Sequence, residues 1–87
     1  MNMNEYVNRI IELASKYFGV DESGLNEEST WKDDLHIDVA KSLQDTRFVE
    51  FKNALDEEFE IEIANIKFGK TKNIREMAEF IAEMCEE

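Results

Sequence analysis

The chain has 87 residues, 43% of them hydrophobic, and a formal net charge of -11 from 21 acidic and 10 basic residues. That charge would repel phosphate backbones, so we expect no nucleic-acid partner. It suits solubility, and it also suits docking onto basic patches of other proteins. The length predicts a single small domain over residues 1–87, without room for a deep catalytic cleft beside its core.

Cysteine usage and the lengths of apolar runs indicate the compartment. The one cysteine, Cys85, excludes an internal disulfide and fits a reducing environment. Its register with Ile74 and Ile81 predicts that it packs in the core rather than serving as a reactive thiol. No apolar run is long enough to cross a membrane, and residues 1–10 lack the basic start and apolar core of a signal peptide. We therefore expect a cytoplasmic protein without membrane insertion.

The first half of the chain predicts one helix and one long loop. Apolar residues recur at helical spacing from Asn4 to Phe18, and Gly19 follows at the position of a C-terminal cap. Residues 20–37 are rich in Gly, Ser, Thr and acids, and they predict a long ordered loop. Five scattered apolar side chains are expected to pin this loop to the core: Val20, Leu25, Trp31, Leu35 and Ile37.

The second half predicts two further main helices. One covers at least residues 47–59, where apolar residues fall on one face: Phe48, Phe51, Leu55 and Phe59, with Ala54 beside them. The segment that follows alternates only briefly, so we predict an irregular link with one helical turn near residues 64–67. Asn73 is placed as an N-cap, with Glu76 in capping-box position, and opens the last helix. These elements predict an all-α fold, a small helical bundle of three main helices plus one short helix, with a long first loop.

Residues with catalytic or metal-binding chemistry are sparse. His36 is the one histidine and lacks the paired His or Cys ligands of transition-metal motifs, so we interpret it as a loop residue. The acids of residues 21–34 do not follow the spacing of a calcium loop. No glycine-rich phosphate loop occurs, and no serine can be joined to a base and an orienting acid. We therefore expect that the chain is not an enzyme on its own.

Four stretches in this order resemble the acyl carrier proteins: IIELASKYFGVDESGL, WKDDLHID, SLQDTRFVEFKNALDEEFEIEI and NIREMAEFI. The resemblance implies an acidic four-helix carrier whose third helix is short. It also implies a 4'-phosphopantetheine arm, attached through a phosphodiester to a serine at the start of the second main helix. The thiol of the arm holds acyl groups as thioesters. A phosphopantetheinyl transferase installs the arm from coenzyme A with magnesium, and separate acyl-processing enzymes act on the acyl chain.

Ser42 is the candidate attachment residue, although the usual Asp-Ser-Leu signature of the family is absent. Counting forward from residues 33–35 places the serine position at Val39, whereas counting backward from residues 54–55 places it at Asp45. The two counts differ, so the region carries an insertion, and Ser42 lies midway. It is the best candidate for the phosphopantetheine arm.

Two local arrangements of Ser42 remain open from the sequence. A helix that begins near Asp38 would turn Ser42 to solvent, almost opposite Phe51 and Leu55, and would permit attachment. A helix that begins after Ser42 would use its hydroxyl as a cap, with Asp45 three residues later. A serine that caps a helix can still be modified if it remains exposed.

The acids of the second main helix are candidates for partner binding. The resemblance favours Glu50, Asp56 and Glu57, with Asp45 nearby, as contacts for basic patches on the transferase and the acyl-processing enzymes. An ordinary solvated helix face explains the same residues. Two other functions remain: a degenerate carrier fold that acts as an unmodified acidic adaptor or interaction module, favoured by Asp45 at the backward-counted position, and a helical interaction protein unrelated to acyl transfer. We expect a monomer.

Overall fold

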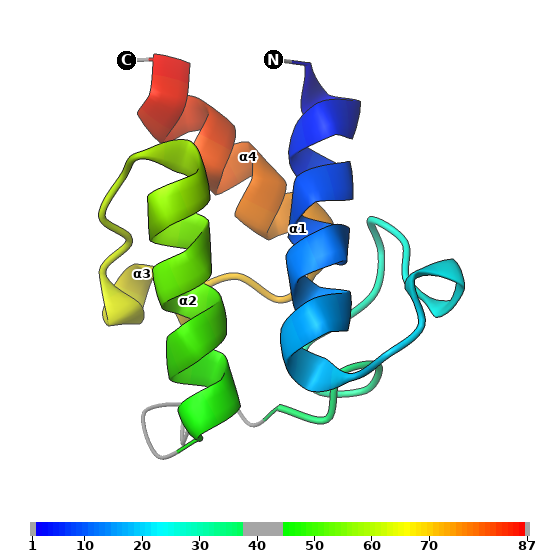
Figure 1. The fold of residues 1–87 in the computed structure, drawn as a ribbon. Coiled ribbons are helices and arrows are strands. Elements are labelled where there is room, and N and C mark those ends of the chain that lie inside the picture. The colour runs from blue at the N-terminus through cyan, green and yellow to red at the C-terminus, as the bar shows by residue number, and fades with distance from the viewer. Residues whose placement is uncertain (1, 38–44, 87) are drawn as a thin grey trace.

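The computed structural model describes residues 2–37 and 45–86. Within these ranges the only strand-like contact is an isolated antiparallel bridge between Thr30 and Asn73, so the expected all-α bundle is confirmed. The three main helices, the short helix and the long first loop are all present. Figure 1 shows the elements in chain order: α1 (Met3–Phe18), the 3-10 turn η1 (Glu22–Gly24), α2 (Thr46–Phe59), α3 (Asn65–Phe68) and α4 (Ile74–Glu86).

Helix α1 packs against both α2 and α4 and is capped at both ends. The Asn2 side chain accepts the Glu5 N–H at 3.0 Å. Gly19 has a φ of 69°, a left-handed conformation that glycine adopts without steric cost, and its N–H donates to the Ser15 carbonyl. The predicted helix and its C-terminal cap are therefore confirmed. Its buried face consists of Tyr6, Val7, Ile10, Ala14 and Phe18.

Helix α2 buries the predicted apolar face and ends in a fixed turn. Glu60 has a φ of 55° and donates its N–H to the Asp56 carbonyl. The Asp56 carboxylate accepts the Ile63 N–H at 2.9 Å and pairs with Lys52 Nζ at 2.9 Å. The Asp56 side chain thus contacts both a lysine on the surface of α2 and the backbone of the link to α3. The buried residues of α2 are Phe48, Phe51, Leu55 and Phe59.

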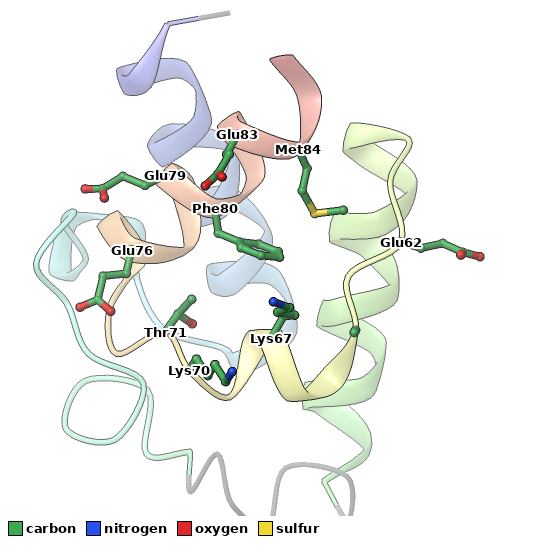
Figure 2. A pocket seen from close by; sticks show the side chains of 10 residues that line it. Glu62, Lys67, Lys70, Thr71, Glu76, Glu79, Phe80, Glu83 and Met84 are labelled. Atoms are coloured by element: carbon green, nitrogen blue, oxygen red, sulfur yellow. The ribbon is translucent and has the colours of Figure 1, made fainter. Parts of the chain in front are cut away.

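The short helix α3 confirms the single turn predicted near residues 64–67. Its last residue, Phe68, is fully buried. The Phe68 ring centroid lies 4.6 Å from that of Phe48 and 5.3 Å from that of Trp31. Aromatic pairs of this kind contribute about 0.5–1.5 kcal/mol beyond their buried area. On its outer side α3 borders an open pocket of about 720 Å³, whose other wall is α4 (Figure 2).

The long first loop is held to the core as predicted. The Leu25, Trp31, Leu35 and Ile37 side chains are buried, and Val20 is half-buried against the core. The Ile37 N–H donates to the Trp31 carbonyl at 2.8 Å, so the end of the loop folds back onto Trp31. The turn η1 is a detail that the apolar pattern did not predict, since none of its residues is buried.

The loop also pairs with the chain just before α4, and we call this region the loop–α4 junction (residues 27–31 and 71–75). Three backbone hydrogen bonds join its segments: Trp31 N–H to Lys72 O (3.3 Å), Ile74 N–H to Ser29 O (3.1 Å) and Arg75 N–H to Glu27 O (2.8 Å). They surround the isolated bridge between Thr30 and Asn73. Segments about 40 residues apart in the sequence therefore supply hydrogen-bond partners for each other's backbone N–H and C=O groups. Such groups need a partner when they are buried.

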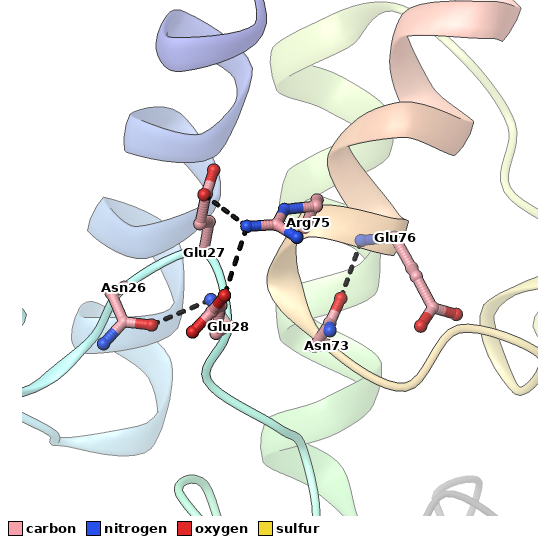
Figure 3. Close-up of polar contacts among 6 residues, drawn as sticks. All are labelled: Asn26, Glu27, Glu28, Asn73, Arg75 and Glu76. Atoms are coloured by element: carbon pink, nitrogen blue, oxygen red, sulfur yellow. Dashed lines mark hydrogen bonds and ion pairs between the residues drawn. The ribbon is translucent and has the colours of Figure 1, made fainter.

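Side chains strengthen the same junction. The buried Trp31 donates its Nε1–H to the Thr71 hydroxyl at 3.2 Å, and that hydroxyl donates to the Phe68 carbonyl at 2.7 Å. The Arg75 guanidinium contacts the carboxylates of Glu27 and Glu28 (Figure 3). Its hydrogen bond with Glu27 is the main reason that the pKa of Arg75 is raised. The loop is thereby joined both to α3 and to α4.

Helix α4 begins as predicted, but its C-terminal end differs from the prediction. The Asn73 side chain accepts the Glu76 N–H at 2.8 Å, which confirms the N-cap (Figure 3). The Glu76 carboxylate accepts the Lys72 N–H rather than closing a capping box. The prediction that Cys85 packs in the core is wrong, because its side chain is exposed. Ala82 is the last buried residue of α4, so the helix extends one turn beyond the core.

Candidate functional site

The predicted site residues in the described part of the chain lie at the start of α2 and along the helix. Asp45 is extended, with φ -101° and ψ 112°, and its carboxylate accepts the Arg47 N–H at 2.9 Å. Asp45 is therefore the N-cap, and α2 begins at Thr46. Ser42 and the start expected near Asp38 lie outside the described residues, so the two predicted arrangements of Ser42 stay predictions.

Arg47 joins the start of α2 to α1. Its guanidinium pairs with the Asp45 carboxylate, with Nη2 3.1 Å from Oδ2, and lies over the Phe18 ring at 5.7 Å from the centroid. The Arg47 guanidinium is the main cause that lowers the pKa of Asp45, assisted by the Arg47 backbone N–H and opposed by partial burial. The same hydrogen bond raises the pKa of Arg47. The first turn of α2 is thus held by an ion pair within its own sequence.

The four acids predicted to bind partners divide into two pairs. Asp45 caps α2, and Asp56 holds Lys52 and the Ile63 N–H, so both carboxylates have structural contacts. Glu50 and Glu57 are exposed, and neither takes part in an ion pair among the described residues. They are seven residues apart, which is about two helical turns, so they lie on the same side of α2.

An exposed apolar residue accompanies these two acids and was missed by the sequence analysis. Val49 has 36% of its surface exposed, which is unusual for a large apolar side chain in this chain. The signal was present, because Val49 lies off the apolar stripe of α2. We refer to Val49, Glu50, Asn53 and Glu57 as the exposed α2 face. It combines an apolar contact point with two carboxylates, which suits a partner with a basic patch around an apolar contact.

The single histidine and the possibility of a metal site are the remaining candidates for site chemistry. His36 lies in the loop, as interpreted from the sequence, and is exposed with a φ of 57°. Residues 2–37 and 45–86 contain no group of three His, Cys, Asp or Glu side chains arranged to hold a metal ion.

None of the described helices combines the length and apolar character needed to cross a membrane.

Compared with models of known protein families, the chain matches none of them.

Proposed function

We propose that the chain is an acyl carrier protein. Ser42 carries a covalently attached 4'-phosphopantetheine arm, and the thiol of that arm holds acyl groups as thioesters. The chain does not catalyse acyl chemistry itself. It presents the acyl chain, as a cytoplasmic monomer, to the enzymes of fatty-acid, polyketide or related biosynthesis.

The exposed α2 face is the observation that carries this proposal. It begins seven residues after Ser42 in the sequence, and its Glu50 and Glu57 carboxylates are not used within the described fold. A carrier needs such a surface because its partners must recognise the protein while they act on the arm. The net charge of -11 favours encounter with basic patches on those partners. The short α3 between two longer helices also agrees with the architecture that the resemblance implies.

The start of α2 does not fit the phosphate of the arm. The Asp45 carboxylate already accepts the Arg47 N–H, and the Arg47 guanidinium is already paired with the same carboxylate. A phosphate placed there would meet a negative charge on the helix cap. The proposed attachment to Ser42 therefore depends on the covalent phosphodiester, and we assign no described residue to binding the phosphate.

An unmodified acidic adaptor is the second candidate function. Asp45 occupies the N-cap of α2, which is the place that the backward count gives to the serine of the family. An aspartate there supports a carrier-like fold that has lost its arm. Such an adaptor would use the exposed α2 face and would not need the Ser42 hydroxyl.

Intact-mass measurement distinguishes the two functions. We expect the full chain, incubated with coenzyme A, magnesium and a broad-specificity phosphopantetheinyl transferase, to gain the mass of one phosphopantetheine group. Ser42→Ala abolishes the gain, whereas Ser23→Ala, at an exposed serine of η1, retains it.

Two results would contradict the carrier proposal or its site. No gain under conditions that modify a known carrier favours the adaptor. A gain that persists in Ser42→Ala overturns the assignment of Ser42 but keeps the carrier function.

A further inference from the structure

The pocket between α3 and α4 has no role in the proposed function. It shares no residue with the exposed α2 face, and its shape is an open groove of about 720 Å³ rather than a closed cavity. An open groove beside a helix offers a long contact to another helix, whereas a small ligand is usually enclosed on most sides. The shape of the groove therefore favours a protein segment as its ligand.

Helix α4 supplies the apolar floor of the groove. Phe80 and Met84 are half-buried and four residues apart, so they lie one above the other along the helix. Phe80 packs against the edge of the core, and Figure 2 shows its ring directed into the pocket. Side chains one turn apart match the spacing of apolar residues along a second helix.

The charged side chains of the groove are divided between its two edges. Lys67 and Lys70 line the α3 side, with Glu62 on the link before α3, and Glu79 and Glu83 line the α4 side together with Glu76. The two lysines, Glu79 and Glu83 are exposed, and none of these four takes part in an ion pair among residues 2–37 and 45–86. Opposite charges on either side of an apolar floor complement a helix with the reverse arrangement.

We infer that this groove binds an amphipathic helix of a partner protein. The apolar stripe of that helix covers Phe80 and Met84. Its basic residues face Glu79 and Glu83, and its acidic residues face Lys67 and Lys70. A membrane surface is a poorer match, because anionic headgroups would meet both the glutamates and the overall charge of -11. This interaction is independent of an arm on Ser42.

The probe is a synthetic helical peptide with a leucine stripe, lysines along one side and glutamates along the other. Its net charge is zero, so the overall charge of the chain does not attract it. Titrated into the full ¹⁵N-labelled chain, it is expected to cause saturable amide shifts in residues 67–71 and 79–84. Saturable binding without shifts in residues 67–71 and 79–84 would overturn the inference, and so would shifts centred on the exposed α2 face. The absence of any saturable shift up to millimolar peptide would overturn it as well.

Matched variants separate groove binding from general charge effects. Glu79→Lys with Glu83→Lys should weaken binding about tenfold. Glu50→Lys with Glu57→Lys changes the net charge equally and should leave the affinity within about twofold. Equal weakening by both pairs would overturn the inference.

Phe80→Ser provides a second test of the apolar floor. It should weaken binding by about tenfold or more. Val49→Ser, which removes an apolar side chain from the exposed α2 face, should leave the affinity unchanged. Circular dichroism checks that each variant is folded. If Phe80→Ser unfolds, the charge variants decide the outcome by themselves.

Discussion

The loop–α4 junction and the exposed α2 face use polar residues in opposite ways. At the junction, polar groups pair within the chain: the Trp31 indole with Thr71, and the Arg75 guanidinium with Glu27. On the exposed α2 face, neither Glu50 nor Glu57 forms an ion pair with another described residue. The junction links distant segments of the fold, whereas the exposed α2 face leaves its charges available to a partner.

The two regions should therefore differ in how much the free energy of unfolding falls when a side chain is removed. A buried polar group that loses its partner keeps its desolvation penalty, which costs more than the net value of the bond. An exposed carboxylate remains hydrated in both the folded and the unfolded chain, so its removal costs little. Substitutions of the buried Trp31 and Thr71 at the junction should therefore change stability, whereas substitutions on the exposed α2 face should change only interactions with partners.

The largest expected effect is that of Trp31→Ala. The indole is 1% exposed, packs against Phe51 and Phe68 and donates to Thr71. Its removal leaves a cavity beneath the loop and should lower the free energy of unfolding by about 3–5 kcal/mol. Urea unfolding followed by circular dichroism measures the loss.

Val49→Ala is the matched control on the exposed α2 face. It should change the free energy of unfolding by less than about 0.5 kcal/mol. The comparison fails if the two variants are destabilised equally, because the junction would then have no special role in closing the fold.

A smaller loss is expected for Thr71→Val, which keeps the shape of the side chain and removes its hydroxyl. The Trp31 Nε1–H loses its acceptor, and the Phe68 carbonyl loses a donor. The free energy of unfolding should fall by about 1–3 kcal/mol. Trp31 is the single tryptophan, so its fluorescence follows the same site directly. Thr46→Val, at an exposed threonine of α2, should leave both stability and fluorescence nearly unchanged.

Features that repeat along the sequence could be predicted. The apolar spacing of α1, α2 and α4 gave their positions, because each helix buries one continuous face. Local caps such as Gly19 and Asn73 could be predicted as well, since their partners lie within four residues. The loop anchors were evident because large apolar residues are rare in that acidic segment.

Features that depend on distant partners could not be predicted. The pairing of Trp31 with Thr71 joins residues 40 apart, and no local pattern identifies such a partner. Asp45 is the N-cap of α2, whereas the sequence analysis placed it three residues after a possible cap, because a polar side chain can cap only where the helix begins. Cys85 continues the apolar register of α4, but periodicity does not indicate where the core ends.

A still smaller effect on stability is expected from titration of Asp45. Its pKa is lowered in the folded chain, chiefly by the Arg47 guanidinium. A lowered folded pKa means that the ionised carboxylate stabilises the fold above the ordinary pKa. This stabilisation is lost as the pH falls through the folded value.

Asp45→Asn tests that dependence while keeping an oxygen for the helix cap. The variant should be less stable than the parent chain at neutral pH, and the difference should shrink at about pH 3. Urea unfolding at both pH values measures the two differences. A difference that grows on acidification would contradict the assigned role of the Asp45 carboxylate.

The smallest change in stability is expected on the exposed α2 face itself. Glu50→Lys with Glu57→Lys should alter the free energy of unfolding by less than about 0.5 kcal/mol, because both side chains are exposed and unpaired among the described residues. The same variant should slow phosphopantetheinylation, since a basic partner would meet lysines where it requires acids. Glu79→Lys with Glu83→Lys changes the net charge by the same amount on α4 and should slow the reaction less. Equal rates for the two variants would show that net charge alone, and not the exposed α2 face, governs encounter with the transferase.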